Sequence, residues 1–122
     1  MHEQTEITAA RPRIVVLCGS TRHGDALAEA TLHESAAGRI VLAPVGSINQ
    51  PHPLWEDAEQ AERLREQFGM LHRRKIELAD EVLIVNPDGY IGDSTRGEIT
   101  YASSLGKPIR YTHPAERSED RG

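Results

Sequence analysis

The sequence has very little cysteine: Cys18 is the only one in 122 residues, so no intramolecular disulfide can form. Such a chain is typical of a reducing compartment, and we expect a cytoplasmic protein. The first eleven residues are polar and lack the apolar segment of a secretory signal. No apolar run approaches the length that crosses a bilayer, so we expect no membrane partner.

Positive charge is also scarce, because the formal net charge is −5. Proteins that bind nucleic acid polymers present a basic surface, which this composition does not favour. The six histidines form no HxxxH or HExxH pair, the spacing that places two ligands on one helix face. We therefore expect no nucleic acid partner, no metal site and no resident cofactor.

Four short, β-branched apolar runs alternate with three helical patterns. The runs are residues 14–18, 40–44, 82–86 and 109–111, and the expected helices are 25–37, 55 or 56 to 79, and 95–105. The stripe predicted to be buried on the second helix is Ala61, Leu64, Phe68, Leu71, His72, Ile76 and Ala79. This alternation predicts an α/β fold with one domain over residues 12–112, between flexible ends at 1–11 and 113–122. We expect a Rossmann- or flavodoxin-like three-layer sandwich, with four parallel strands in the order 2-1-3-4 and helices on both faces.

Two loops rich in Gly, Ser and Thr follow the first and third runs, at residues 19–25 and 86–98. In the order 2-1-3-4 both loops leave the carboxyl ends of neighbouring strands, where such sheets form a crevice. Backbone N–H groups at a helix start and the guanidinium of Arg22 suit an anion such as phosphate. Gly19 and Gly24 equally fit a simpler role in tight turns.

Glu98 follows the second of these loops. A carboxylate beside a pocket for a sugar phosphate is suited to N-glycosidic chemistry. The segment Thr95-Arg96-Gly97-Glu98 also matches a capping box, in which Thr95 caps the helix and Glu98 binds the N-cap amide. Both roles of Glu98 stay open at this point.

His72 lies on the edge of the apolar stripe of the second helix. It fits either a core histidine or a residue that contacts substrate at the carboxyl edge of the sheet, toward which its side chain leans.

Three segments in this order resemble the nucleoside 2-deoxyribosyltransferase-like superfamily, which includes the 2′-deoxynucleoside 5′-monophosphate N-glycosidases. They are Leu-Cys-Gly-Ser-Thr-Arg at 17–22, Leu-Ala-Asp-Glu-Val-Leu-Ile-Val at 78–85, and Ser-Thr-Arg-Gly-Glu-Ile-Thr-Tyr-Ala at 94–102 with Gly-Lys-Pro at 106–108. The resemblance spans residues 13–111. This chain departs from it at Val16, where family glycosidases commonly have tyrosine, and at His72, where they carry an aspartate.

The resemblance implies that Glu98 is the nucleophile and that Gly19, Ser20 and Arg22 hold the 5′ side of a nucleotide. His72 would replace the family's aspartate as the group that positions or protonates the leaving base, with Asp93 or Asp88 as other proton donors. The remaining predicted substrate contacts are Asn86, Ser94 and Thr95.

The predicted function is therefore hydrolysis or transfer at the N-glycosidic bond of a nucleotide or nucleoside, by a homodimer. The alternative is a nucleotide-binding or sensing module without catalysis.

Overall fold

The computed structural model describes residues 11–114, which form four strands and three α-helices. In chain order these are β1 (Ile14–Cys18), α2 (Gly24–Ala36), β2 (Ile40–Leu42), α3 (Ala58–Leu78), β3 (Glu81–Ile84), α4 (Asp93–Ser104) and β4 (Ile109–Tyr111), with short 3-10 turns η1 (Pro53–Trp55) and η2 (Pro87–Gly89). The strands form one parallel sheet in the order β2-β1-β3-β4, which confirms the predicted topology. No helix in this part of the chain is long and apolar enough to cross a membrane.

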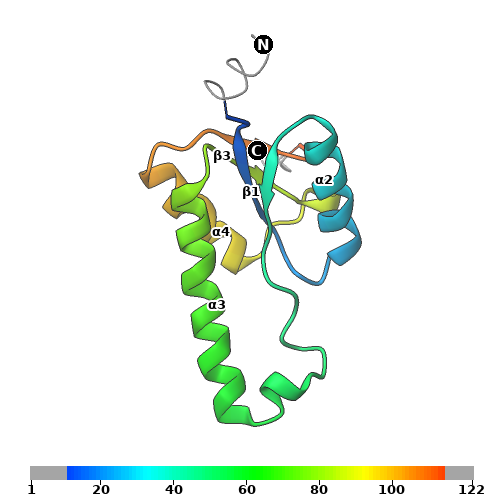
Figure 1. Cartoon of the computed structure of the whole chain (residues 1–122), viewed down its shortest axis with the longest axis vertical. Coiled ribbons are helices and arrows are strands. Elements are labelled where there is room, and N and C mark those ends of the chain that lie inside the picture. Colours follow the sequence, from blue (N-terminus) through cyan, green and yellow to red (C-terminus); the bar gives the residue numbers. More distant parts are fainter. Residues whose placement is uncertain (1–10, 115–122) are drawn as a thin grey trace, which may run out of the picture.

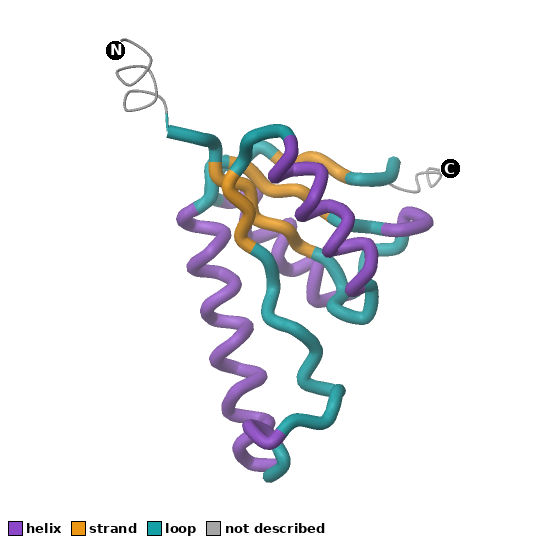
Figure 2. The backbone as a smooth tube through the Cα atoms, turned by 45° about the vertical axis from the view of Figure 1, so that its right-hand side comes forward, coloured by secondary structure: helices purple, strands orange, loops and turns teal. Residues whose placement is uncertain are grey.

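Alternate side chains of β1 pack on opposite faces of the sheet. Val16 and Cys18 belong to the cluster with α3 and α4, whereas Val15 and Leu17 belong to the cluster with α2. The sheet therefore lies between helices on both sides, as Figure 2 shows. The three-layer prediction is confirmed, and burial on both faces explains why the two central strands are apolar apart from Glu81 at the start of β3.

Helix boundaries differ from the prediction where a stronger local signal lies nearby. Asp57 caps α3 by accepting a hydrogen bond from the Gln60 N–H at 2.9 Å, so this helix begins after η1 rather than at residue 55 or 56. The helix α4 begins at Asp93 with Gly92 as its N-cap, two residues before the predicted start. Gly38, with φ +89°, follows the end of α2 as predicted.

The longest helix, α3, projects beyond the sheet, and residues 43–57 lead from β2 to its far end (Figure 1). Only its last turns cover strands: Ile76 is fully buried, whereas Leu71 is 42% exposed. The prediction that Leu71 belongs to a buried stripe is wrong, although the next residue, His72, is buried and contacts Cys18 of β1. Trp55 packs edge-on against Phe68 in the projecting part.

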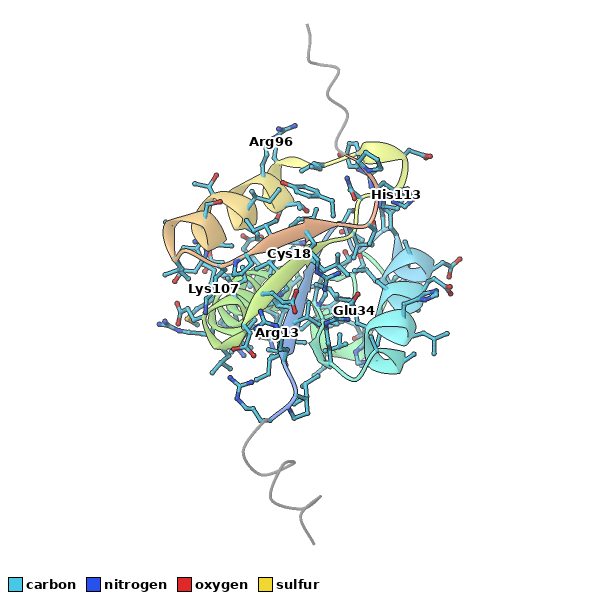
Figure 3. The ribbon with its side chains drawn as sticks, turned by 90° about the horizontal axis from the view of Figure 1, so that it is seen from above. Arg13, Cys18, Glu34, Arg96, Lys107 and His113 are labelled. Carbon is cyan, nitrogen blue, oxygen red and sulfur yellow. The ribbon has the colours of Figure 1, made fainter. Side chains whose placement is uncertain are left out.

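The carboxyl end of α3 is fixed by Lys107, which follows α4. Its Nζ donates to the carbonyls of Glu77 at 3.0 Å and Ala79 at 2.7 Å, so a cation satisfies carbonyls that the helix leaves free (Figure 3). This contact joins α3 and α4 on one face of the sheet.

The predicted flexible ends lie mostly outside the described residues. At their inner boundaries, Arg11 pairs with the Asp80 carboxylate at 2.8 Å. The N–H and C=O of His113 each bond to the Asn86 amide at 3.0 Å. These contacts attach Arg11 and His113 to the rest of the domain.

Candidate functional site

A cavity of about 400 Å³ opens at the carboxyl ends of β1 and β3. Both predicted loops reach it, so the fold brings them to one place. Its walls are residues 19–22, 44–49 and 92–95, with Arg65, Phe68, Gly69, His72, Tyr90 and Glu98. The volume lies in the range of sites for small organic ligands.

Three side chains from three elements meet at the inner wall of this cavity, where His72 and Glu98 line it and Cys18 lies buried behind them. We call Cys18, His72 and Glu98 the carboxyl-edge cluster. The Nε2 atom of His72 lies 3.5 Å from the Cys18 Sγ and 3.8 Å from a Glu98 carboxylate oxygen. Cys18 is fully buried and the His72 side chain is 7% exposed, whereas that of Glu98 is 22% exposed. Glu98 is therefore the member of the cluster most open to a ligand.

Burial changes the ionisation of all three groups. Desolvation raises the pKa of Glu98, an effect that Cys18 and Arg73 partly offset. Desolvation, with a smaller contribution from Lys75, lowers the pKa of His72 to about 4. Burial and the neighbouring Glu98 raise the pKa of the Cys18 thiol. At neutral pH the thiol and the imidazole of the cluster are thus both neutral.

The hydrogen bonding of His72 is incomplete. Its Nδ1 is buried and has no hydrogen-bond partner among residues 11–114. An unsatisfied buried polar atom costs free energy, whichever nitrogen of the ring carries the proton. A proton on Nε2 leaves Nδ1 as an acceptor without a donor among these residues and directs the Nε2–H toward Glu98.

The first loop holds Arg22 at the mouth of the cavity. Its backbone N–H and its Nε both lie 3.3 Å from the Ser20 hydroxyl oxygen. Its guanidinium donates to the Tyr90 hydroxyl at 3.2 Å and lies 5.3 Å from the centre of that ring. Among residues 11–114 the partners of this cation are all neutral, so it remains available to an anion.

Gly19 is needed because the loop passes close to β3. A Cβ atom at this position would lie 2.6 Å from the Val85 carbonyl oxygen. Glycine is therefore required here by the close approach of two backbone segments. The sequence alone indicated only a tight turn.

The start of α4 forms the opposite wall. Gly92 is the N-cap and Thr95 is buried inside the first turn, so Thr95 does not cap the helix and the capping-box interpretation of Glu98 is wrong. Ser94 is exposed at the cavity. Glu98 stands more than one turn into the helix, with its carboxylate at the cluster instead of at the helix start.

Eight of the ten predicted site residues line the cavity: Gly19, Ser20, Arg22, His72, Asp93, Ser94, Thr95 and Glu98. The other two do not. Asn86 is fully buried, with its amide bonded to Thr112 and His113, so it is not exposed to a substrate in the cavity. Asp88 sits in η2 with φ +59°, at an exposed turn that does not line the cavity.

Sequence reasoning missed Tyr90, Phe68, Arg65 and the wall formed by residues 44–49. Tyr90 could have been predicted, because it follows the third strand at the carboxyl edge of the sheet. Residues 44–49 could not, because their position depends on how far α3 projects.

Comparisons with protein-family models, curated proteins and solved structures find no match to this chain.

Proposed function

We propose that the cavity binds a nucleotide or nucleoside and that Glu98 cleaves its N-glycosidic bond as a nucleophile. The observation that supports this most is the shared cavity: the Glu98 carboxylate, the Arg22 loop and the start of α4 all line it. A sugar phosphate has one end that needs a cation and backbone amides, and one reacting carbon that a carboxylate can attack. The resemblance to the nucleoside 2-deoxyribosyltransferase-like superfamily supports the same assignment.

In the proposed reaction a Glu98 oxygen bonds to the anomeric carbon while the carbon–nitrogen bond breaks. The bond's electron pair leaves with the base, which takes up one proton. Water, or a second base in a transferase, then attacks the glycosyl ester and releases the carboxylate. A partly exposed carboxylate suits this role when no lysine or arginine of residues 11–114 forms an ion pair with it, and Arg73 acts on Glu98 only from a distance.

The phosphate or 5′-hydroxyl end fits the mouth of the cavity. Arg22, Ser20 and the first N–H groups of α4 at Ser94 lie there. The base fits the wall at Phe68, which offers aromatic surface away from the Arg22–Tyr90 contact. His72 would contact the base or sugar through Nε2, and a bound anion would raise its pKa toward the value needed for proton donation.

Base release tests the proposal directly. The protein is incubated with ribo- and deoxyribonucleoside 5′-monophosphates of each base, and free base is measured by chromatography. We expect release by the wild type and at least a thousandfold loss in Glu98→Gln. Glu66→Gln, an exposed carboxylate on α3, is the matched control and should keep full activity.

The alternative is a nucleotide-binding module without catalysis. It predicts a ligand-dependent rise in melting temperature with no free base in any incubation. Absence of both base release and any thermal shift across the panel would reject both functions and leave a structural role.

We also propose that two chains associate through the exposed part of α3. Met70 and Leu71 are adjacent there and are 51% and 42% exposed. Light scattering after size exclusion should give twice the chain mass, and Leu71→Glu should give the monomer mass.

A further inference from the structure

We propose that Cys18, His72 and Glu98 bind one divalent transition-metal ion of the zinc class, with its fourth position open to the cavity. This site does not require the proposed glycosidase activity. It follows from the donor atoms of the three side chains and from their separations.

The separations fit a tetrahedral ion. Metal–sulfur bonds of about 2.3 Å and metal–nitrogen or metal–oxygen bonds of about 2.0–2.2 Å place neighbouring ligand atoms about 3.3–3.6 Å apart. The Sγ–Nε2 distance is 3.5 Å and the Nε2–carboxylate distance is 3.8 Å. No two of the three ligand atoms are more than 4.8 Å apart. A small rotation of the Glu98 side chain, the longest and most exposed of the three, would close the remaining gap.

The donor set selects the metal. Sulfur and imidazole nitrogen favour zinc, cobalt and related ions, whereas magnesium and calcium require oxygen ligands. Three protein ligands with an open fourth position are typical of reactive zinc sites, and here that position faces a cavity of about 400 Å³.

The charges also balance. Binding displaces the proton of the Cys18 thiol to solvent, so a thiolate and the Glu98 carboxylate together neutralise a dication. Neutrality matters because this part of the cavity is largely desolvated.

The hydrogen bonding of His72 predicts that the metal ion binds reversibly. Coordination through Nε2 places the imidazole proton on Nδ1, which has no acceptor among the described residues. Structural metal sites usually supply that acceptor, and its loss typically lowers affinity about 10–100-fold. We therefore expect a chelator to remove the ion without unfolding the protein.

One consequence rests on the proposed function. An ion held by the Glu98 carboxylate occupies the nucleophile, so zinc should inhibit base release, and a chelator should restore it. If base release is never seen, this consequence fails, but the metal site itself is tested separately.

Cobalt provides that test because thiolate bound to Co²⁺ gives an intense near-ultraviolet charge-transfer absorption. Cys18 is the only cysteine of the chain, so this absorption can come from no other residue. We expect it to saturate at one Co²⁺ per chain and to disappear when zinc or a chelator is added. Saturation at one ion per two chains would overturn the site, since it would indicate two Cys18 thiolates on one ion.

Variants separate this site from surface binding. Cys18→Ser and Cys18→Ala should abolish the absorption, and His72→Gln or Glu98→Gln should weaken Co²⁺ binding at least tenfold. The control is His33→Gln, because His33 pairs with Glu29 at 2.8 Å on the surface and could bind ions adventitiously. It should leave the absorption unchanged. Circular dichroism checks that each variant folds. Absence of the absorption in the folded wild type, or its persistence in folded His72→Gln and Glu98→Gln at unchanged affinity, would overturn the proposal.

Discussion

The two edges of the sheet bury polar groups in opposite ways. At the amino edge, Glu34 and Glu81 are buried, and three arginines, Arg13, Arg39 and Arg110, neutralise them through ion pairs of 2.8–3.5 Å. At the carboxyl edge, the cluster of Cys18, His72 and Glu98 holds contacts of 3.5 Å and 3.8 Å, and the His72 Nδ1 has no partner in the part of the chain that the structure describes. The two buried carboxylates of the amino edge have arginine partners, whereas the polar groups of the carboxyl edge stay available to a ligand.

This difference indicates a division of labour within one small domain. Each Glu81 oxygen has an arginine partner, and that arrangement holds β1, β3 and β4 together at one end. The carboxyl edge gives up such pairing, which costs stability but leaves reactive groups accessible. Four substitutions test that reading, in order of decreasing effect.

Glu81→Ala should cause the largest loss of stability. It leaves Arg13 and Arg110 without a shared carboxylate, and we expect the free energy of unfolding to fall by about 2–3 kcal/mol. The loss stays below that of a fully buried pair because these arginines reach solvent. Urea denaturation measures it, with Glu29→Ala, an exposed carboxylate, as a control that should change stability by less than about 0.5 kcal/mol. Equal losses in the two variants would contradict a special role for the amino edge.

Gly19→Ala should be the next largest. Its Cβ would meet the Val85 carbonyl oxygen at 2.6 Å, so the loop or β3 must move, at a cost of about 1–3 kcal/mol. The matched control is Gly24→Ala, where an added Cβ has no neighbour within 4 Å. Thermal unfolding of both variants checks this. A control that loses as much stability as Gly19→Ala would show that chain flexibility, not the close approach, decides.

His72→Leu should stabilise the protein, by about 1 kcal/mol at pH 7, because it removes an unsatisfied buried polar group. The gain should grow as the pH falls. The pKa of His72 is about 4 when folded, against an ordinary 6.5, so between these values the unfolded wild type binds more protons and its stability declines. At pH 5 this adds up to about 2 kcal/mol to the difference. Denaturation at pH 7 and pH 5 measures it, and a difference independent of pH would reject the buried neutral imidazole.

Glu98→Gln should give the smallest change in stability. Burial raises the pKa of Glu98, so the ionised carboxylate costs stability at any pH above its ordinary value of 4.5. The glutamine variant avoids that cost, and its advantage should vanish as the pH falls to 4.5. Unfolding curves across this range check the sign; a variant less stable than wild type at pH 8 would mean that Glu98 is a structural carboxylate.

Much of the fold could be predicted because its signals are local. The central strands are short apolar runs, and Gly38 and Gly106, both with positive φ, mark helix ends. The α4 boundary could not be predicted from the capping box, since Gly92 and Thr95 both offer an acceptable start and packing selects between them. Propensity alone carries no information on that choice.

The candidate site could be predicted only in part, because its residues are far apart in the sequence. Cys18, His72 and Glu98 come from β1, α3 and α4, so no motif of nearby residues unites them. Asn86 shows the opposite error: it follows a strand as a site residue should, but His113, 27 residues later, takes both ends of its amide. Such long-range competition for hydrogen bonds is set by the tertiary structure.

The outer strands of the sheet, β2 and β4, have three residues each. Pro44 follows the first closely and Pro108 directly precedes the second. An intruding chain would find few free amides in a row on either border. This architecture guards against strand addition between molecules, so concentrated solutions should resist fibril formation even where heating loosens the helices.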